Sequence, residues 1–211
     1  MTSELKIGIV GLPNVGKSTL FNAILKKQVA LVANYPFATV NPNIGIAKVP
    51  DSRLEKLSSW FDKDSPPPIV ETTIKFVDIA GLVKGAAKGE GLGNQFLAHI
   101  REASIILQVV RNFSDKNVIR KGSTNPDSDT EIINTELILK DLETVEKKLK
   151  TIGADPKRKE EKSLLEKALK DLSGGKTIDS LDELSLLTQK PLIYAFNINE
   201  TELKNLSSSV H

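Results

Sequence analysis

The sequence contains no cysteine among its 211 residues. Disulfide bonds and thiolate metal sites are therefore excluded, and a reducing compartment is allowed. The net charge of +2 is too small to indicate nucleic-acid binding by itself. No apolar run approaches the ~20 residues of a membrane span. The first expected strand begins at Leu5, which leaves no room for a signal peptide. These features predict a soluble, cytoplasmic protein without a membrane partner.

One stretch, GLPNVGKST at residues 11–19, matches the phosphate-loop pattern G-x-x-x-x-G-K-[ST]. An apolar run at residues 5–10 precedes it and predicts a buried strand, and an amphipathic run at residues 19–27 predicts a helix. In this setting Gly11 and Gly16 leave backbone N–H groups free to bind phosphate at a helix N-terminus. The context predicts a nucleoside-triphosphate site rather than a chance glycine-rich turn.

Each residue of this loop has an expected role. Lys17 would place its ammonium group on the β- and γ-phosphates, and the Ser18 hydroxyl would ligate Mg²⁺. The residues expected to contact the nucleotide phosphates are Asn14, Val15, Gly16, Lys17, Ser18 and Thr19.

A loop rich in proline and asparagine follows at residues 32–43. It lies between the first helix and an expected strand at residues 44–49. In phosphate-loop switch proteins such a loop carries a threonine that completes the Mg²⁺ shell, and Thr39 is the candidate here. Viewed alone, Thr39 could be a turn residue that caps its own backbone, but its placement between the first helix and the next expected strand favours the Mg²⁺ role.

The second strong motif is D-x-x-G, at the end of an expected strand that begins at Lys75. Asp78 would hold Mg²⁺ through a water molecule, and the Gly81 N–H would contact the γ-phosphate. Lys17, Asp78 and Gly81 are therefore the candidate catalytic residues. Leu82 occupies the position at which Ras-like proteins carry a water-orienting glutamine, so hydrolysis should be slow. Five glycines between residues 81 and 93 predict a mobile switch segment.

The remaining chain predicts a helix at residues 94–103, a strand at 105–110, a polar connector at 111–129 and a strand at 190–197. His99, in the first of these, is expected to lie outside the site. A polar tail at 201–211 should lack further structure. A helical hairpin is expected between the connector and the strand at 190–197. Its first helix repeats apolar residues at coiled-coil spacing. These residues are Ile138, Leu142, Val145 and Leu149. The basic tip of the hairpin is either a solvated charged face or an arm that docks on RNA or a ribosome.

Together these motifs resemble the Obg group of phosphate-loop GTPases in the TRAFAC class, and more closely the YchF or Obg-like ATPase family. The glycine-rich run after D-I-A-G is highly specific to that family. The resemblance implies an α/β Ras-like G domain: a mostly parallel sheet with helices on both faces and an inserted coiled-coil hairpin. It divides the chain into G-domain residues 1–130, hairpin residues 131–176 and a G-domain continuation at 177–211.

Nucleotide choice is expected to depend on Asn197, Ile198 and Glu200. Ras-like GTPases have N-K-x-D here; this chain has N-I-N-E, which lacks the lysine and lengthens the acid. The resemblance implies ATP binding in preference to, or alongside, GTP, hydrolysis to ADP, and a ribosomal partner without DNA specificity. Two alternatives remain open: a guanine-specific Obg-type GTPase, and a nucleotide-gated ribosome-binding module with incidental turnover.

Three further expectations come from the resemblance. Asn14 matches a phosphate-loop asparagine that helps to bind K⁺ in related GTPases. Arg120 stands where many family members carry a histidine, and its charge could still stabilise phosphate. The family continues into a last strand, a last helix and a TGS domain, so the chain is expected to be a truncated piece.

Overall fold

The computed structural model describes residues 5–26, 43–61, 66–79, 92–115, 117–120, 123–153, 155–178, 181 and 184–207. The strands are β1 (Lys6–Val10), β2 (Asn43–Lys48), β3 (Thr73–Asp78), β4 (Ile105–Asn112) and β5 (Leu192–Ile198). The helices are α1 (Lys17–Lys26), α2 (Ser52–Ser58), α3 (Leu92–Glu102), α4 (Pro126–Ile152), α5 (Lys159–Ser173) and α6 (Glu200–Ser207). Two short 3₁₀ helices are η2 (Pro156–Arg158) and η4 (Leu187–Gln189).

The strands form one sheet in the order β2-β3-β1-β4-β5. Strands β3, β1, β4 and β5 run parallel, and β2 is antiparallel to β3. The predicted mostly parallel α/β fold is therefore confirmed. Ile9 of β1 lies opposite Asp78 of β3 and Leu107 of β4. The carboxyl ends of these three strands thus meet at one edge of the sheet, where open α/β sheets bind ligands.

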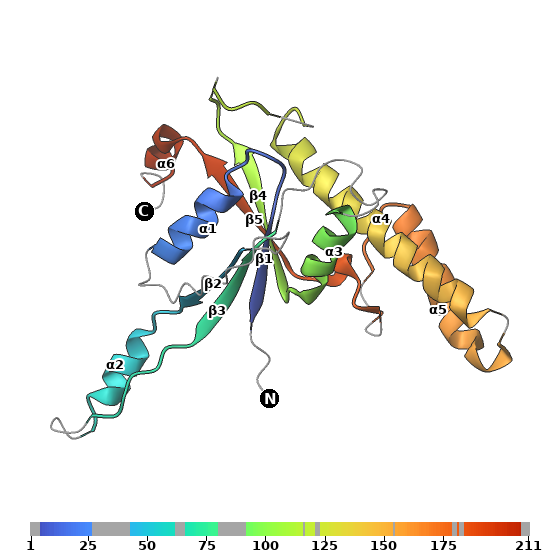
Figure 1. Cartoon of the computed structure of the whole chain (residues 1–211), viewed down its shortest axis with the longest axis horizontal. Helices are drawn as coiled ribbons and strands as arrows, with labels where there is room; N and C mark the ends of the chain where they lie inside the picture. Colours follow the sequence, from blue (N-terminus) through green and yellow to red (C-terminus); the bar gives the residue numbers. More distant parts are fainter. Residues whose placement is uncertain are drawn as a thin grey trace.

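Helices cover both faces of the sheet (Figure 1). Helix α1 packs on β1, β2 and β3, while α3 packs on β1 and α4 on β4 from the other side. The central strands are buried on both faces, which explains their continuous apolar sequences. The core between the layers includes Ile9, Val10, Val77, Leu97, Ile100, Ile106 and Val109.

The predicted helical hairpin is present as α4 and α5, which extend away from the sheet (Figure 1). Helix α4 begins at Pro126, earlier than the expected hairpin boundary at 131, because Asn125 and Ser128 form a reciprocal capping box. It ends at Gly153, whose φ of 60° suits glycine. A second core, separate from that of the sheet, joins the two helices. Its buried residues are Val145, Ile152, Leu165, Ala168, Leu172 and Leu186.

A buried carboxylate attaches the hairpin to the segment that leads into β5. Asp141 of α4 is fully buried and accepts hydrogen bonds from the Leu187 and Thr188 amides, each at 2.8 Å, and from the Thr188 hydroxyl at 2.7 Å. Burial raises the pKa of Asp141 above its ordinary value, and these three hydrogen bonds oppose the rise. The contact fixes the base of the hairpin against η4.

Two expectations about connecting segments need correction. The predicted polar connector at 111–129 is shorter than expected, because β4 continues to Asn112, α4 begins at Pro126, and both Arg111 and Asp129 are buried. The tail is not without structure either, since α6 occupies Glu200–Ser207. Local contacts mark the start of α6. The Asn199 carbonyl accepts from the Glu202 N–H, and the Glu202 carboxylate approaches the Asn199 N–H at 3.4 Å.

Among the described residues, no helix combines the length and hydropathy needed to cross a membrane.

Candidate nucleotide site

The phosphate loop, residues 11–18, leaves the end of β1 and enters α1 at Lys17. Buried Leu12 and Val15 anchor the loop in the core. Gly16 has a φ of 103°, and a Cβ atom there would lie 2.5 Å from the Asn197 amide nitrogen. Only glycine fits this close approach without strain. The loop therefore presents the N-terminus of α1, where amide groups lack partners within the helix, to the open edge of the sheet.

Lys17, Ser18 and Asp78 meet at this edge. The Ser18 hydroxyl donates to Asp78 Oδ2 at 2.7 Å, and Lys17 Nζ lies 3.7 Å from Asp78 Oδ1. Only 11% of the Lys17 side chain and 6% of the Asp78 side chain are exposed. The pairing of β1 with β3 brings the three residues together, because the phosphate loop and Asp78 follow adjacent parallel strands.

The donor atoms of this cluster suit Mg²⁺. The ion prefers oxygen ligands and uses one or two carboxylates together with phosphate and water, rather than an all-protein cage. The cluster offers one hydroxyl and one carboxylate, and among the described residues the buried Asp78 Oδ1 has no hydrogen-bond partner. No group of three or more His, Asp or Glu side chains suitable for a metal occurs in the described part of the chain.

The N-I-N-E segment lies beside the phosphate loop. Asn197, at the end of β5, donates through Nδ2 to the Val15 carbonyl at 3.0 Å. Ile198 is half-buried, and Glu200 is exposed in the first turn of α6. Sequence reasoning placed Asn197 in contact with the nucleotide; the structure shows that its amide nitrogen also ties β5 to the loop. Expected base-contacting and phosphate-contacting residues thus lie close together.

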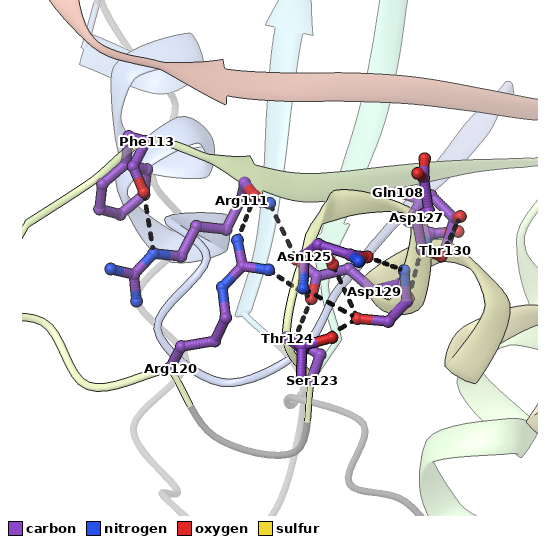
Figure 2. A network of polar contacts seen from close by, with 11 residues as sticks. Gln108, Arg111, Phe113, Arg120, Ser123, Thr124, Asn125, Asp127, Asp129 and Thr130 are labelled. Atoms are coloured by element: carbon purple, nitrogen blue, oxygen red, sulfur yellow. Dashed lines mark hydrogen bonds and ion pairs between the residues drawn. The ribbon is translucent and has the colours of Figure 1, made fainter.

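A polar network follows β4 (Figure 2). Asn14 Nδ2, in the phosphate loop, donates to the Ile119 carbonyl at 3.2 Å. The Arg120 guanidinium contacts the Arg111 carbonyl at 2.5 Å and Asp129 Oδ1 at 3.4 Å. Arg120 is therefore bound to the end of β4 and the first turn of α4. The expectation that its charge stabilises phosphate has no support in this geometry.

Sequence reasoning missed the acceptor at the centre of this network, Asp129, which is 2% exposed. One signal was present: Gln108 interrupts the apolar run of β4, and its Nε2 donates to the Asp129 carbonyl at 3.2 Å. A polar residue in a buried strand requires a buried partner. The Ile119 carbonyl could not have been found, since a backbone group carries no signal in the sequence.

Three expected site residues, Thr39, Gly81 and Leu82, lie outside the described residues. Thr19 lies in the first turn of α1 and is exposed. His99, predicted to lie outside the site, belongs to the last turn of α3.

A family model described as "50S ribosome-binding GTPase" matches residues 6–165, most of the chain. The chain belongs to this family. Among curated proteins, the "Ribosome-binding ATPase YchF" of Bacillus subtilis (strain 168) is 45% identical, over 97% of this chain and 59% of that protein. The protein of the same name from Mycoplasma genitalium is 49% identical, again over 97% of this chain and 59% of that protein.

A solved structure gives the same result. The "Schizosaccharomyces pombe YchF GTPase" superposes with a TM-score of 0.74 at 40% identity, covering 96% of this chain and 59% of that one. The kinship with YchF and the phosphate-loop GTPase fold, both inferred from the motifs, are confirmed. The chain spans about three-fifths of the length of the relatives it matches.

Proposed function

We propose that this chain binds a nucleoside triphosphate with Mg²⁺, prefers ATP to GTP, and hydrolyses it slowly as a conformational switch that acts at the ribosome. The observation that carries the proposal is the convergence of Lys17, Ser18 and Asp78 at the carboxyl edge of the sheet. A ribosomal partner would place the protein in the cytoplasm. The division into G-domain residues 1–130 and 177–211 and a hairpin at 131–176 belongs to the same proposal.

The binding step follows from charge and hydrogen bonding. The amide groups of the loop and the Lys17 ammonium would hold the β- and γ-phosphates. Ser18 and Asp78 would hold Mg²⁺, with Thr39 as a further ligand; bound Mg²⁺ neutralises charge on the phosphate oxygens. Asp78 would exchange its contact with Ser18 for the metal shell, and the Gly81 N–H would sense the γ-phosphate.

The preference for ATP rests on the N-I-N-E segment. Guanine specificity in Ras-like proteins needs an aspartate that accepts two hydrogen bonds and a lysine whose stem packs on the base. Ile198 and Glu200 replace both residues, whereas the exposed edge of adenine can be read by a backbone carbonyl and N–H near Ile198. The relatives named above are called ATPases, while the family description and the S. pombe title say GTPase. GTP binding is therefore the second candidate.

Equilibrium titration with fluorescent ATP and GTP analogues, in the presence of Mg²⁺, tests this proposal. The unmodified chain should bind ATP more tightly. The double variant Ile198→Lys, Glu200→Asp should shift the preference toward GTP, because it restores the guanine-binding chemistry. Tighter GTP binding by the unmodified chain would establish the guanine-specific alternative, and binding of neither nucleotide would refute the proposed function.

Asn14 supports a requirement for K⁺ as part of this proposal. Since a carbonyl accepts only from the amide nitrogen, the contact with Ile119 turns Asn14 Oδ1 the other way. That oxygen is suited to ligate a monovalent cation beside the phosphates. Steady-state hydrolysis should be faster in K⁺ than in Na⁺, and Asn14→Ala should remove the difference. Equal rates of the unmodified chain in the two salts would dismiss the cation.

The hairpin is the proposed ribosomal contact. Much of its basic charge is paired internally: Glu161 binds Arg158 at 2.6 Å and Lys148 at 3.4 Å. Lys150, Lys157 and Lys159 are exposed near the tip. Their replacement by glutamate should abolish salt-sensitive co-sedimentation with ribosomes while leaving nucleotide affinity unchanged. Co-sedimentation that persists in this triple variant would remove the hairpin tip from the interface, and dependence on one nucleotide state would favour the gated binding module.

A further inference from the structure

Asn14 adopts a backbone conformation that few residues other than glycine adopt. It has a φ of 64°, in the left-handed region, within a loop that the proposed function assigns to phosphate binding. Asparagine tolerates this conformation better than most residues, but its side chain is exposed and would be free to rotate. The described contact that orients it is the hydrogen bond of 3.2 Å to the Ile119 carbonyl. Whatever fixes Ile119 therefore also orients Asn14.

The residue that fixes Ile119 is its neighbour Arg120. The two ends of the guanidinium bind different elements: Nη2 donates to the Arg111 carbonyl at 2.5 Å, and Nη1 lies 3.4 Å from Asp129 Oδ1. This fork joins the end of β4 to the first turn of α4 (Figure 2), and Ile119 directly precedes Arg120 in the chain. Only 21% of the Arg120 side chain is exposed. A planar guanidinium suits such a two-point contact better than a lysine ammonium does.

Asp129 is the buried carboxylate to which one end of the Arg120 guanidinium is attached. Its carboxylate is buried and also accepts from the Arg111 N–H at 3.2 Å and from the Ser123 hydroxyl. Among the described residues, Arg120 is the positively charged side chain that forms an ion pair with this carboxylate. Removing Arg120 would leave a buried carboxylate without that charge, and the segment from 117 to 120 would lose its attachment to α4.

We infer that Arg120 is a positioning residue for the phosphate loop: clamped between Arg111 and Asp129, it holds the Ile119 carbonyl in place to orient the Asn14 carboxamide. The expected effect of Arg120 on nucleotide binding rests on the proposed function. It assigns Arg120 an action through Asn14 rather than a contact with phosphate. It also means that the first turn of α4, and so the base of the hairpin, is mechanically connected to the phosphate loop.

The first test needs no nucleotide. In ¹⁵N-resolved NMR spectra, the Asn14 side-chain NH₂ signals are identified by their loss in Asn14→Ala. Arg120→Gln should shift these signals and speed their solvent exchange, because the Ile119 acceptor moves. Arg53→Gln, which removes an arginine ion-paired to Asp51 on the distant α2, is the matched control and should leave them unchanged. Unchanged Asn14 signals in Arg120→Gln would overturn the inference.

The second test measures coupling. Arg120→Gln should weaken binding of a fluorescent ATP analogue about 3- to 10-fold, the scale of one hydrogen bond. In the Asn14→Ala background the same substitution should cost less than about two-fold, since interacting residues are non-additive. Equal losses in both backgrounds would show that Arg120 acts only on general stability. If Arg120→Gln fails to fold, Arg120→Lys retains the charge without the fork and should give a smaller shift of the Asn14 signals. Failure of the unmodified chain to bind nucleotide would refute the proposed function and leave the NMR result standing.

Discussion

The phosphate-loop end of the sheet and the α4–α5 hairpin are held together by different kinds of contact. At the sheet edge, polar groups from the phosphate loop, α1, β3 and β5 meet although they lie far apart in the sequence: Ser18 binds Asp78, and Asn197 binds the Val15 carbonyl. In the hairpin, apolar residues at helical spacing form the core, and charges pair within a few residues, as Glu143 does with Lys147. The first region is therefore defined by polar contacts between distant parts of the chain, and the second by its own apolar core.

This difference predicts how substitutions in each region should affect nucleotide binding and folding. Substitutions at the sheet edge should alter nucleotide binding with modest effects on folding, and substitutions in the hairpin core should do the reverse. Helix α4 packs on β4, and two buried carboxylates add specific polar links: Asp141 joins the hairpin to η4, and Asp129 joins the first turn of α4 to Arg120. The predictions below test this separation, from the largest expected effect to the smallest.

Leu165→Ala should destabilise the protein most. Leu165 is 1% exposed in the hairpin core. Truncating a buried leucine removes apolar contacts and leaves a cavity, which costs about 2–5 kcal/mol of unfolding free energy. Urea denaturation measures the loss. Nucleotide affinity of the folded variant should stay near that of the unmodified chain, and a matching loss of affinity would show that the two regions are not separate.

Lys17→Ala should weaken nucleotide binding and have only a modest effect on folding. The substitution removes a charged donor from the proposed phosphate site, which is worth about 1.5–3 kcal/mol of binding free energy, or roughly 10- to 150-fold in Kd. Titration with a fluorescent ATP analogue checks this. Lys147→Ala, on the exposed face of the hairpin, is the control and should bind normally. An unchanged Kd in Lys17→Ala would remove Lys17 from the site.

Asp141 should give the hairpin attachment a pH dependence. Because burial raises the pKa of Asp141 in the folded state, folding is favoured when this group is protonated. Its contribution is fully present below the ordinary value of 3.8 and is lost as pH rises through the higher folded-state pKa. Glu102, Glu143 and Glu161 have lowered pKa values and act in the opposite direction.

The comparison with Asp141→Asn isolates that contribution. Urea unfolding of both proteins from about pH 3.5 upward should show the unmodified chain losing stability relative to the variant as pH rises, against the trend set by the other carboxylates. A constant difference between the two curves would mean that Asp141 titrates alike in the folded and unfolded states.

Lys147→Ala should have the smallest effect on stability. Lys147 pairs with Glu143 at 2.6 Å across one helical turn, but 72% of its side chain is exposed. Such pairs contribute about 0.3–0.5 kcal/mol and are screened by salt. Thermal unfolding in low and high salt should show a loss that disappears at high salt. A loss above ~1 kcal/mol would mean that this pair contributes more than an exposed salt bridge normally does.

The sequence by itself determined the pieces whose signals are local. Apolar runs gave the strands, the glycine and lysine pattern gave the phosphate loop ahead of α1, and the coiled-coil spacing gave the hairpin, because backbone preference and one-sided burial are written in neighbouring residues. Tertiary structure alone decided the partners: Asn197 binds a carbonyl 182 residues away, Arg120 contacts Asp129, and Asp141 accepts hydrogen bonds from η4. A buried polar group takes whichever donor or acceptor the packing brings within about 3 Å. That choice depends on how the sheet and helices assemble, which no short stretch of sequence records.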